Sequence, residues 1–376
     1  MIEKTKTKPI LVYYSDWFID SDLTVVKHLT RAFTVHWFVI QPYNAFFTSD
    51  YIRKYCEGTG VNLHIYEIKN RRRSLKWFKL FYSTLRKVRK LNPAIIYTAC
   101  FAPYFLLAYY LTCRNIKVVK AVHDAEKHSN VNYNPFLILG NRIGKKIFNH
   151  YFLFSKNQLE IFHKNHPDKD ARMVGMSTKN YGPSKKSAGS FDEKKILFFG
   201  SLTYYKGYDL MIKAFERIIR DGNKNLTLSI FGEAHEDVKK NCSELIKHKD
   251  RYNLNLSFID NDDVADIFSS HHFVIFPYRD ATQSGPQMIA IYYGKPIIAS
   301  NINCFQEMRQ DGSDAILYDN TDPDGLYHAL KRVANMTEAE YLQMLDKSLV
   351  LKDKYSEENI ANNFIREFND IIASEK

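Results

Sequence analysis

Short apolar segments alternate with helix-like segments along almost the whole chain, and this rhythm limits the folds that the chain can adopt. Apolar runs bounded by polar residues are typical of buried strands, whereas apolar residues at intervals of three and four indicate helices. In the first half the pattern predicts strands at 10–14, 35–40, 61–68, 94–98, 118–122 and 151–154. Strands separated by helices build a parallel sheet with helices on both faces, so we expect this half to be doubly wound.

The same rhythm starts again after a segment without periodicity. Residues 175–193 are rich in Gly, Ser, Lys and Pro, which is typical of a linker. Beyond it the pattern predicts strands at 196–199, 226–231, 254–259, 272–276 and 297–300. We therefore expect an α/β fold of two Rossmann-like domains, 1–185 and 186–355, that face each other across a cleft. The last segment, 356–376, is expected to form a helix that packs back on the first domain.

The composition is that of a globular protein, with 45% hydrophobic residues in a chain of 376. We find no apolar run long enough for a transmembrane helix and no signal-peptide pattern. The five cysteines are scattered and form no C-x-x-C pair, which is typical of reduced thiols in the cytosol. These features predict a cytoplasmic protein.

Charge is divided unevenly between the two halves. Residues 1–190 hold 31 Lys and Arg against 12 Asp and Glu, whereas residues 191–376 hold 22 against 30. A basic half predicts a polyanionic partner. Nucleic acid, an anionic membrane surface and a pyrophosphate-bearing substrate are the candidates.

The basic residues are densest in a predicted helix at 69–90. Its apolar face is expected to contain Leu75, Phe78, Phe81, Tyr82, Leu85 and Val88. A basic amphipathic helix with aromatic residues is typical of a membrane-surface site. We therefore expect an anionic membrane to be faced by Arg71, Arg72, Arg73, Lys76, Trp77 and Lys79. The alternative is a helix that covers the sheet and leaves a solvated basic face.

The loop that follows the predicted strand 272–276 is polar and leads into a helix-like segment that stops at Gly294. Ser284 is suited to cap this helix, and Pro286 to occupy its first turn, where a missing N–H costs nothing. Gly285 lacks a Cβ atom, so a ligand can approach the backbone there. The N–H groups and the positive end of the helix dipole then suit a phosphate, although an ordinary strand-to-helix turn explains the same residues.

Two further loops follow predicted strands of the same domain. One runs from Gly200 to Gly207 and carries Lys206 at the start of a helix, where its ammonium group can reach a phosphate. An ordinary surface lysine is the alternative interpretation. The other loop contains Gly232, directly after the strand 226–231. Because the carboxyl ends of parallel strands meet at one edge of a sheet, we expect the three loops to converge on one ligand site.

These loops belong to a longer stretch whose motifs resemble a known family. Residues 194–333 contain, in this order, FFGSLTYYKGYDLMIKAF, SIFGE, PYRDATQSG with GKPIIAS, and FQEMRQDGSDAILYDNTDPDGLYHAL. In order and spacing they resemble the C-terminal domain of glycosyltransferase family 4, the glycosyl transferases group 1. The first half is similar to that family mainly in its rhythm and in VVKAVHDAEKH at 118–128. The resemblance implies a GT-B fold and an enzyme that uses a nucleotide sugar.

The resemblance also implies roles for individual residues. In the second domain Lys206 matches the lysine that contacts the donor diphosphate, and Gly200 matches the glycine that ends the preceding strand. The other donor-side positions are Ser201, Gly232, Asp280, Thr282, Gln283, Ser284, Gly285 and Glu307. In the first domain His123 matches the histidine near the transferred sugar, and Asp124 and His128 match acceptor-side positions.

Some positions depart from the family's pattern. Many members have an arginine where Ser201 stands, so one phosphate contact is missing. The family's E-x7-E pair falls on Ala281 and Ile289, and neither side chain can accept a hydrogen bond. Asp280 is a candidate replacement for the first carboxylate. Since the second glutamate normally holds the nucleotide ribose, its absence bears on nucleotide identity and affinity.

Glycosyl transfer develops oxocarbenium character at the sugar and negative charge on the leaving diphosphate. Lys206 and the helix N-terminus are expected to stabilise that leaving group electrostatically. The resemblance implies a retaining reaction that needs no metal and no cofactor besides the nucleotide-sugar co-substrate. His123 would orient the sugar or support the developing charge, or else it is a strand-end histidine satisfied by backbone. Asp124 is either the base of an inverting variant or a helix cap.

The leading hypothesis is a cytoplasmic glycosyltransferase that is peripheral to the inner face of the membrane. It would move a hexose-type unit from a UDP- or GDP-sugar to a lipid-linked or polysaccharide acceptor in cell-surface glycan synthesis. Two alternatives stay open: a catalytically weak GT-B module that binds a partner or a glycan, and a sugar-nucleotide epimerase. Nucleic acid is not the expected partner, because no nucleic-acid-binding motif accompanies the basic residues.

Overall fold

The computed structural model describes residues 7–16, 19–43, 45, 47–69, 74–100, 102–125 and 135–374. The chain divides into two compact units, Met1–Ser177 with Glu357–Lys376, and Thr178–Ser356. The first unit therefore ends at Ser177 and not at residue 185. The reason lies in hydrogen bonds that tie the following segment to the second unit. The N–H of Tyr181 donates to Tyr293 Oη at 3.2 Å, and Tyr293 Oη donates to the carbonyl of Gly182 at 3.0 Å.

A parallel sheet of seven strands forms the centre of the first unit, in the order β3-β2-β1-β4-β5-β6-β7. The strands are β1 (Ile10–Ser15), β2 (Thr34–Pro42), β3 (Asn62–Ile68), β4 (Ile95–Thr98), β5 (Val118–Val122), β6 (His150–Leu153) and β7 (Asp170–Met173). Every pairing is parallel, which confirms the doubly wound arrangement. β7 is not predicted by the sequence pattern, because two of its four residues, Asp170 and Arg172, are charged and pair with each other at 2.9 Å.

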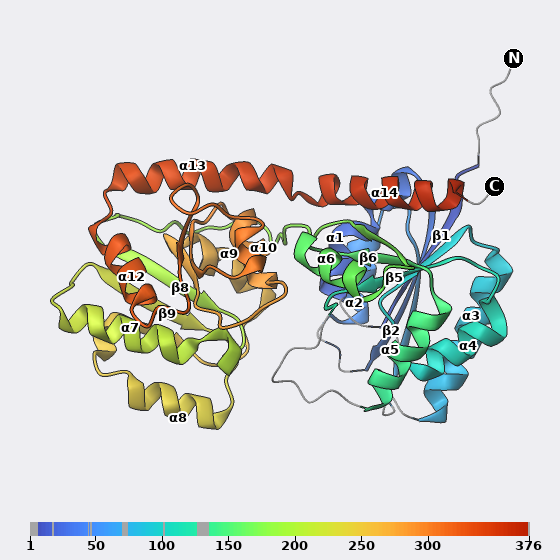
Figure 1. The fold of residues 1–376 in the computed structure, drawn as a ribbon, viewed down its shortest axis with the longest axis horizontal. Coiled ribbons are helices and arrows are strands. Elements are labelled where there is room, and N and C mark those ends of the chain that lie inside the picture. The colour runs from blue at the N-terminus through green and yellow to red at the C-terminus, as the bar shows by residue number, and fades with distance from the viewer. Residues whose placement is uncertain are drawn as a thin grey trace, which may run out of the picture. The chain divides into compact units, whose positions relative to one another are not determined.

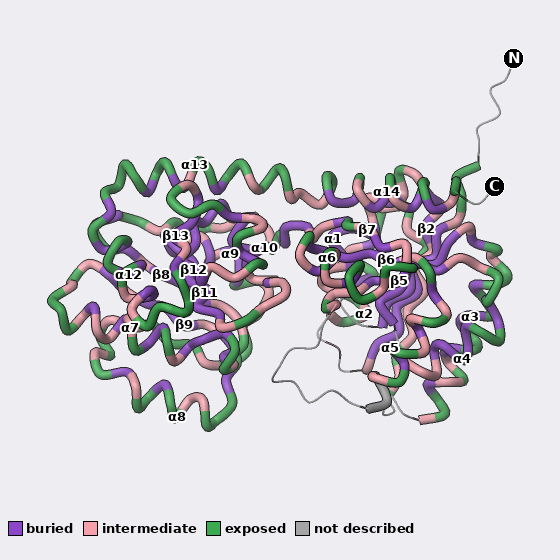
Figure 2. Tube along the Cα trace, viewed as in Figure 1, coloured by how far each residue is buried: buried purple, intermediate pink, exposed green. Residues whose placement is uncertain are grey.

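Helices surround this sheet, as Figure 1 shows. They are α1 (Ile19–Val26), α2 (Ser49–Cys56), α3 (Leu75–Leu91), α4 (Pro103–Cys113), α5 (Pro135–Ile147) and α6 (Lys156–Asn165), with a short 3₁₀ helix at His28–Arg31. The central strands are buried along their length, and the outward faces of the helices are exposed (Figure 2). Within the described ranges, no helix combines the length and the apolar composition that crossing a bilayer requires.

The last helix, α14 (Glu357–Ala373), belongs to the first unit although it follows the second unit in the sequence. Its buried residues recur at intervals of three and four and include Phe364, Phe368 and Ile371. Phe368 packs edge-on against Phe33, with ring centroids 5.9 Å apart. Complete burial of a phenylalanine side chain stabilises a fold by about 1.5–3 kcal/mol. The helix is thus held in the first unit mainly by its apolar face.

Helix α3 is amphipathic, but its buried face differs from the predicted one. Leu75 is 68% exposed, whereas Trp77 is 1% exposed and packs against Phe81 with ring centroids 5.5 Å apart. The prediction that Trp77 faces a membrane is therefore wrong. The helix turns so that its largest side chain enters the core, and the buried face follows Trp77, Phe81, Thr84, Leu85 and Val88. Lys76 and Lys79 are exposed, while Arg71, Arg72 and Arg73 lie outside the described residues.

The second unit contains a parallel sheet of six strands in the order β10-β9-β8-β11-β12-β13. The strands are β8 (Lys194–Phe199), β9 (Leu226–Phe231), β10 (Tyr252–Asn255), β11 (Phe273–Phe276), β12 (Ile297–Ser300) and β13 (Ala315–Tyr318). The strand predicted at 254–259 is found earlier, as the edge strand β10, because the apolar Phe258 stays exposed beyond it. β13 is a strand that the sequence pattern does not predict, and it pairs with β12.

The helices of the second unit are α7 (Tyr208–Arg220), α8 (Glu236–Leu245), α9 (Asn261–Ser269), α10 (Gly285–Tyr292), α11 (Asn303–Gln306), α12 (Gly325–Asn335) and α13 (Glu338–Lys354), with 3₁₀ turns at Tyr204–Lys206 and Lys249–Arg251. α10 begins as predicted: Ser284 is the N-cap, its Oγ accepts from the N–H of Gln287 at 3.3 Å, and Pro286 lies in the first turn. The helix ends just before Gly294, which has a φ of 64°. The sequence therefore predicts both ends of α10 correctly.

Candidate functional site at the switch point of the second sheet

The strand order of the second sheet reverses between β8 and β11. From β8 the chain continues to β9 and β10 on one side, whereas β11, β12 and β13 follow on the other side. Ligands of doubly wound sheets bind outside the carboxyl ends of the strands at such a point. Here the loops after β8 and β11 flank it, and they carry most of the residues predicted to hold the donor. We call the region of loops 200–207 and 277–284, with the first turn of α10, the switch-point site.

Two glycines bring these loops into backbone contact. Gly232 follows β9, and a Cβ atom on it would lie 2.1 Å from the carbonyl oxygen of Gly200. Gly207 ends the loop after β8, and a Cβ atom on it would lie 1.9 Å from the carbonyl oxygen of Pro277. Their φ angles, 150° and 69°, are also in the range that favours glycine. The structure thus brings the three predicted loops together. Gly232 contributes by packing its backbone against Gly200.

Arg279 fastens the loop after β11 to the loop after β8. Its guanidinium group makes two hydrogen bonds of 2.8 Å to the carboxylate of Asp209 at the start of α7. Its backbone N–H donates to the carbonyl of Tyr205 at 2.7 Å, and its guanidinium lies 4.0 Å from the ring centre of Tyr204. Burial alone would raise the pKa of Asp209, but the hydrogen bonds and charge of Arg279 lower it. A bidentate pair of this kind fixes the relative position of the two segments that it joins. The sequence pattern does not predict the pairing of Arg279 with Asp209.

Lys206 is a buried charged group at this edge. It ends the 3₁₀ turn Tyr204–Lys206 and is 7% exposed. Its Nζ lies 3.3 Å from Ser201 Oγ, and 3.0 Å from the position that a Cβ atom on Gly200 would take. Burial lowers its pKa to about 8. An ordinary surface lysine is therefore excluded, and an anion beside the ammonium group would offset the cost of its burial.

The N-terminus of α10 lies at the same edge, since the helix follows the carboxyl end of β11. Pro286 Cγ lies 3.6 Å from the position that a Cβ atom on Gly200 would take, next to Lys206. In the loop that leads to the helix, Thr282 and Gln283 are half-buried and Ser284 is buried. The positive end of the helix dipole thus adds to the charge of Lys206. Together they suit an anion with several oxygens.

Asp280, in the loop after β11, and Glu307 both act on Cys304. Burial raises the pKa of the Cys304 thiol, and the charges of Glu307 and then Asp280 raise it further. Both carboxylates are therefore close to Cys304. Asp280 is exposed, and Glu307 is half-buried at the end of α11. The two predicted donor-side carboxylates thus share Cys304 as a neighbour, and Asp280 belongs to a loop of the switch-point site.

The structure also explains the missing E-x7-E pair. Ile289 is 4% exposed and belongs to an apolar cluster with Phe276, Tyr278 and Phe305. Ala281 packs against the same cluster. A carboxylate at the position of Ile289 would lose its hydration without a partner, which costs several kcal/mol. In this chain the position of the second glutamate is therefore occupied by a core residue, Ile289.

In the first unit, His123 follows the carboxyl end of β5 and is half-buried. Its ring stacks on Phe154, with centroids 4.3 Å apart and planes at 15°. Asp124 is exposed, and the next N–H, of Ala125, donates to Gln158 Oε1 at 2.7 Å. His128 lies outside the described residues. His123 is thus held by an aromatic ring at a strand end of the first sheet.

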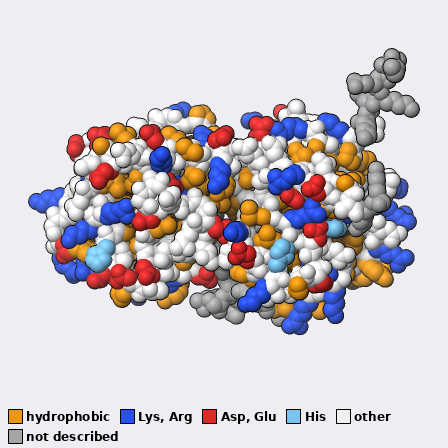
Figure 3. Space-filling model, turned by 45° about the horizontal axis from the view of Figure 1, so that its top comes forward, with side chains coloured by type: hydrophobic (Ala, Val, Ile, Leu, Met, Phe, Trp, Pro, Cys, Tyr) orange, Lys and Arg blue, Asp and Glu red, His pale blue; other side chains and the backbone are white. Residues whose placement is uncertain are grey.

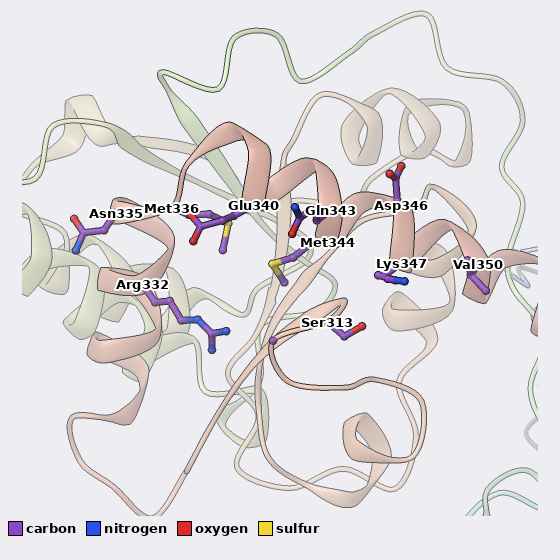
Figure 4. A pocket seen from close by; sticks show the side chains of 11 residues that line it. Ser313, Arg332, Asn335, Met336, Glu340, Gln343, Met344, Asp346, Lys347 and Val350 are labelled. Atoms are coloured by element: carbon purple, nitrogen blue, oxygen red, sulfur yellow. The ribbon is translucent and has the colours of Figure 1, made fainter.

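A separate hollow of about 840 Å³ lies beside the amino end of β13, where Ser313, Arg332 and Lys347 line it (Figure 4). Arg332 pairs with Asp311 at 3.1 Å, and Glu340 accepts from the N–H of Thr337 at 2.8 Å. Two of the charged groups there are therefore engaged within the protein. Because the hollow lies away from the carboxyl ends of the strands, it is not part of the switch-point site.

Comparison with known proteins identifies a family domain in the second unit. Residues 193–336 match the family model for glycosyl transferases group 1. An uncharacterized glycosyltransferase of Methanocaldococcus jannaschii is 27% identical over 176 residues, which are 46% of this chain and 44% of that protein. An uncharacterized glycosyltransferase of Haemophilus influenzae is 25% identical over 197 residues, 51% of this chain and 54% of that protein. The chain thus spans about half the length of the curated relatives that it matches.

The fold has close counterparts among solved structures. The Anabaena protein HepE, solved in complex with UDP and glucose, superposes with a TM-score of 0.72 at 11% identity, over 96% of this chain and 99% of that one. At such low identity the superposition shows only that the two proteins share a fold, and this fold is GT-B. Together with the doubly wound sheets, this shows that the chain has the GT-B fold and that its residues 193–336 form a glycosyl transferases group 1 domain.

Proposed function

We propose that this protein transfers a sugar from a UDP-sugar to a lipid-linked or polysaccharide acceptor. The observation that carries the proposal is the switch-point site, where the buried Lys206 lies next to the first turn of α10. A buried ammonium group beside a helix N-terminus has the chemistry of a diphosphate site. The GT-B counterparts support UDP as the nucleotide, since HepE was solved with UDP and with UDP-glucose.

In the proposed reaction the bond between the sugar and the diphosphate breaks, and negative charge develops on the leaving phosphate. Lys206 and the dipole of α10 stabilise that charge, because both are fixed in place before the reaction begins. We propose that an acceptor oxygen bonds to the anomeric carbon with retention of configuration, and that the leaving phosphate takes the proton of that acceptor hydroxyl. Under this proposal, Lys206 acts on the nucleotide half of the donor.

His123 is the first-unit residue that we propose for the transfer step. Its ring is held by Phe154, so its orientation is fixed at the end of β5. If it supports the transferred sugar, His123→Ala should lower kcat by roughly 100-fold, within the range of positioned polar groups. The affinity for UDP, which lacks the sugar, should stay within twofold of wild type. An unchanged kcat in the variant would remove His123 from the reaction.

A second candidate function is a binding module with little or no transfer activity. The apolar surroundings of Ile289 favour it, because the carboxylate that normally holds the ribose has no place there. Both functions predict UDP binding, so binding alone does not separate them. Release of UDP from a UDP-sugar in the presence of acceptor lipids or oligosaccharides supports the enzyme. A UDP-sugar that is converted to its epimer without any acceptor would favour an epimerase.

The direct test is a thermal-shift series with UDP, GDP and their sugars. A ligand at 100 times its Kd stabilises the native state by about 2.7 kcal/mol, so a true donor gives a clear shift. We expect UDP compounds to raise the melting temperature and Lys206→Met to reduce that rise by about half or more. Lys213→Met, at an exposed lysine of the adjacent helix α7, is the matched control. If no nucleotide shifts the transition and none of the sugars is turned over, the proposed function fails.

We also propose that the first unit docks on an anionic membrane through helices α3 and α4. On α4, one face exposes Leu107, Tyr110 and Leu111. On the neighbouring α3, the exposed cations are Lys76, Lys79, Arg86, Lys87, Arg89 and Lys90. In Figure 3, lysine and arginine side chains gather at the edge of the molecule where Figure 1 places these helices. Exposed apolar residues beside cations suit a lipid interface, where each cation contributes about 1 kcal/mol.

Vesicle pelleting tests this docking surface. Neutralising Lys79 and Arg86 should reduce binding to vesicles with anionic lipid, and Leu107→Ser with Leu111→Ser should reduce it further. The control replaces two exposed lysines of the second unit, Lys224 and Lys331, by Gln. Equal loss in the control variant, or no loss in either, would contradict the proposed surface.

A further inference from the structure

The segment that enters the second unit carries a lysine to the start of α10. The N–H of Thr178 donates to the carbonyl of Tyr355 at 2.8 Å, and the N–H of Lys179 lies 3.4 Å from the carbonyl of Met288 within α10. Two residues later, Tyr181 and Gly182 are bound to the hydroxyl of Tyr293. The backbone of this segment is thus fixed along α10. Lys179 itself is 9% exposed.

The ammonium group of Lys179 lies beside Gly285, the first residue of α10. A Cβ atom built on Gly285 would meet Lys179 Nζ at 3.4 Å. Lys206 Nζ and Pro286 Cγ lie 3.0 Å and 3.6 Å from the position of a Cβ atom on Gly200. Gly200 and Gly285 therefore each leave room for a lysine ammonium group, and the two lysines approach the first turn of α10 from different segments.

Two cations match the charge of a diphosphate better than one. The two phosphates of UDP carry more negative charge than one lysine neutralises, and Ser201, which accepts a hydrogen bond from Lys206, is neutral. Both lysines carry a positive charge, and an anion that reaches both gains two charge-assisted contacts. The sequence pattern did not single out Lys179, because it precedes the strand β8 by a long loop.

We propose that Lys179 is a second phosphate-binding residue of the switch-point site and holds the nucleotide diphosphate together with Lys206. This proposal rests on the proposed use of a UDP-sugar and adds a residue that reaches the donor from outside the strand-end loops. It also explains why residue 285 is a glycine, because the absence of a Cβ atom leaves space for the ammonium group of Lys179.

Calorimetric titration of the full chain with UDP and with uridine tests this proposal. Lys179→Met should weaken UDP binding by about 10-fold or more, the loss that accompanies a hydrogen bond to a charged group. It should leave uridine binding unchanged, because uridine has no phosphate. Lys186→Met, at an exposed lysine of the same segment, is the matched control and should bind UDP like wild type. If Lys179→Met does not fold, Lys179→Gln removes the same charge and keeps a polar end group.

The outcomes separate this inference from the proposed function. Loss of UDP affinity in both Lys179→Met and Lys206→Met, with uridine binding intact, supports the inference. Loss in Lys206→Met alone overturns the inference and leaves the proposed function standing. Equal weakening of UDP and uridine by Lys179→Met overturns it too, because the lysine would then act on the fold of the site. If neither variant changes UDP binding, the proposed function fails together with the inference.

Discussion

The burial of Lys206 gives a prediction in which stability and binding move in opposite directions. Its pKa falls from 10.5 to about 8 because the ammonium group is buried. A shift of that size corresponds to about 3 kcal/mol of lost stability, since each pKa unit is worth about 1.4 kcal/mol. The folded pKa lies below the unfolded one, so this cost is fully present at pH 7 and disappears as the pH rises from 8 to 10.5.

Lys206→Met removes the charge and keeps the length of the side chain. At pH 7 we expect the free energy of unfolding of the ligand-free protein to rise by about 1–3 kcal/mol, because a well-packed apolar replacement of a buried charge is often stabilising. For a unit of this size the melting temperature rises by about 2–4 °C per kcal/mol. In contrast, the Kd for UDP should increase at least about 10-fold, because a charge-assisted contact is lost.

Chemical denaturation and calorimetric titration with UDP measure the two effects in the same variant. Lys213→Met serves as the control, since this lysine is exposed on α7 and should change neither quantity. A variant that is less stable than wild type by more than about 1 kcal/mol would refute the burial cost. A variant that binds UDP as tightly as wild type would refute the role of Lys206 in the switch-point site.

The remaining predictions concern pH and packing. UDP affinity of the wild type should fall as the pH rises through about 8, with proton uptake on binding near that pH, because Lys206 must be charged. Gly232→Ala should cost several kcal/mol in unfolding free energy, since its Cβ atom would lie 2.1 Å from a carbonyl oxygen, whereas Gly222→Ala, also at positive φ but with open space, should cost about 1 kcal/mol. Burial raises the pKa of Asp22 to about 7, so the unfolding free energy should decrease between pH 4 and 7, and Asp22→Asn should flatten that decrease. Phe368→Ala should destabilise the first unit by about 3–5 kcal/mol.

Each of these predictions has an outcome that contradicts it. The pH argument fails if titrations at pH 8 in buffers of different ionisation enthalpy show no proton transfer. The backbone contact of Gly232 is disproved if both glycine variants melt at the same temperature. Identical pH profiles of wild type and Asp22→Asn would show that this carboxyl group is not the source of the pH dependence. A Phe368→Ala protein with wild-type stability would mean that α14 does not depend on its apolar face.

Much of the fold could be predicted because it depends on local patterns. The period of apolar residues gave most strands of both sheets, and the cap at Ser284 with Pro286 gave the start of α10. It did not give β7, whose charged residues pair with each other, or the position of β10, which lies at an edge and needs no apolar run. Edge strands are specified by the hydrogen bonds of a single neighbour, and no local pattern in the sequence records which neighbour that is.

The phase of a helix is another property that the period alone does not determine. In α3 the residues Leu75, Trp77, Phe78 and Phe81 are all apolar, so two overlapping faces have the same spacing. The structure buries Trp77 and leaves Leu75 exposed, because the core has room for the larger ring beside Phe81. Which of two apolar stripes turns inward is decided by the cavity that it fills.

The sequence by itself determined the alternation of strands and helices, the division into two units and the three loops that hold the candidate donor residues. Only the tertiary structure decided that Gly232 packs on Gly200 and Gly207 on Pro277, that Arg279 joins two of the loops, and that Lys179 reaches Gly285 from outside them. The physical reason is that propensities, caps and periods act over a few residues. The charges that gather at the start of α10 come from segments that are distant in the sequence and meet only when the sheet forms.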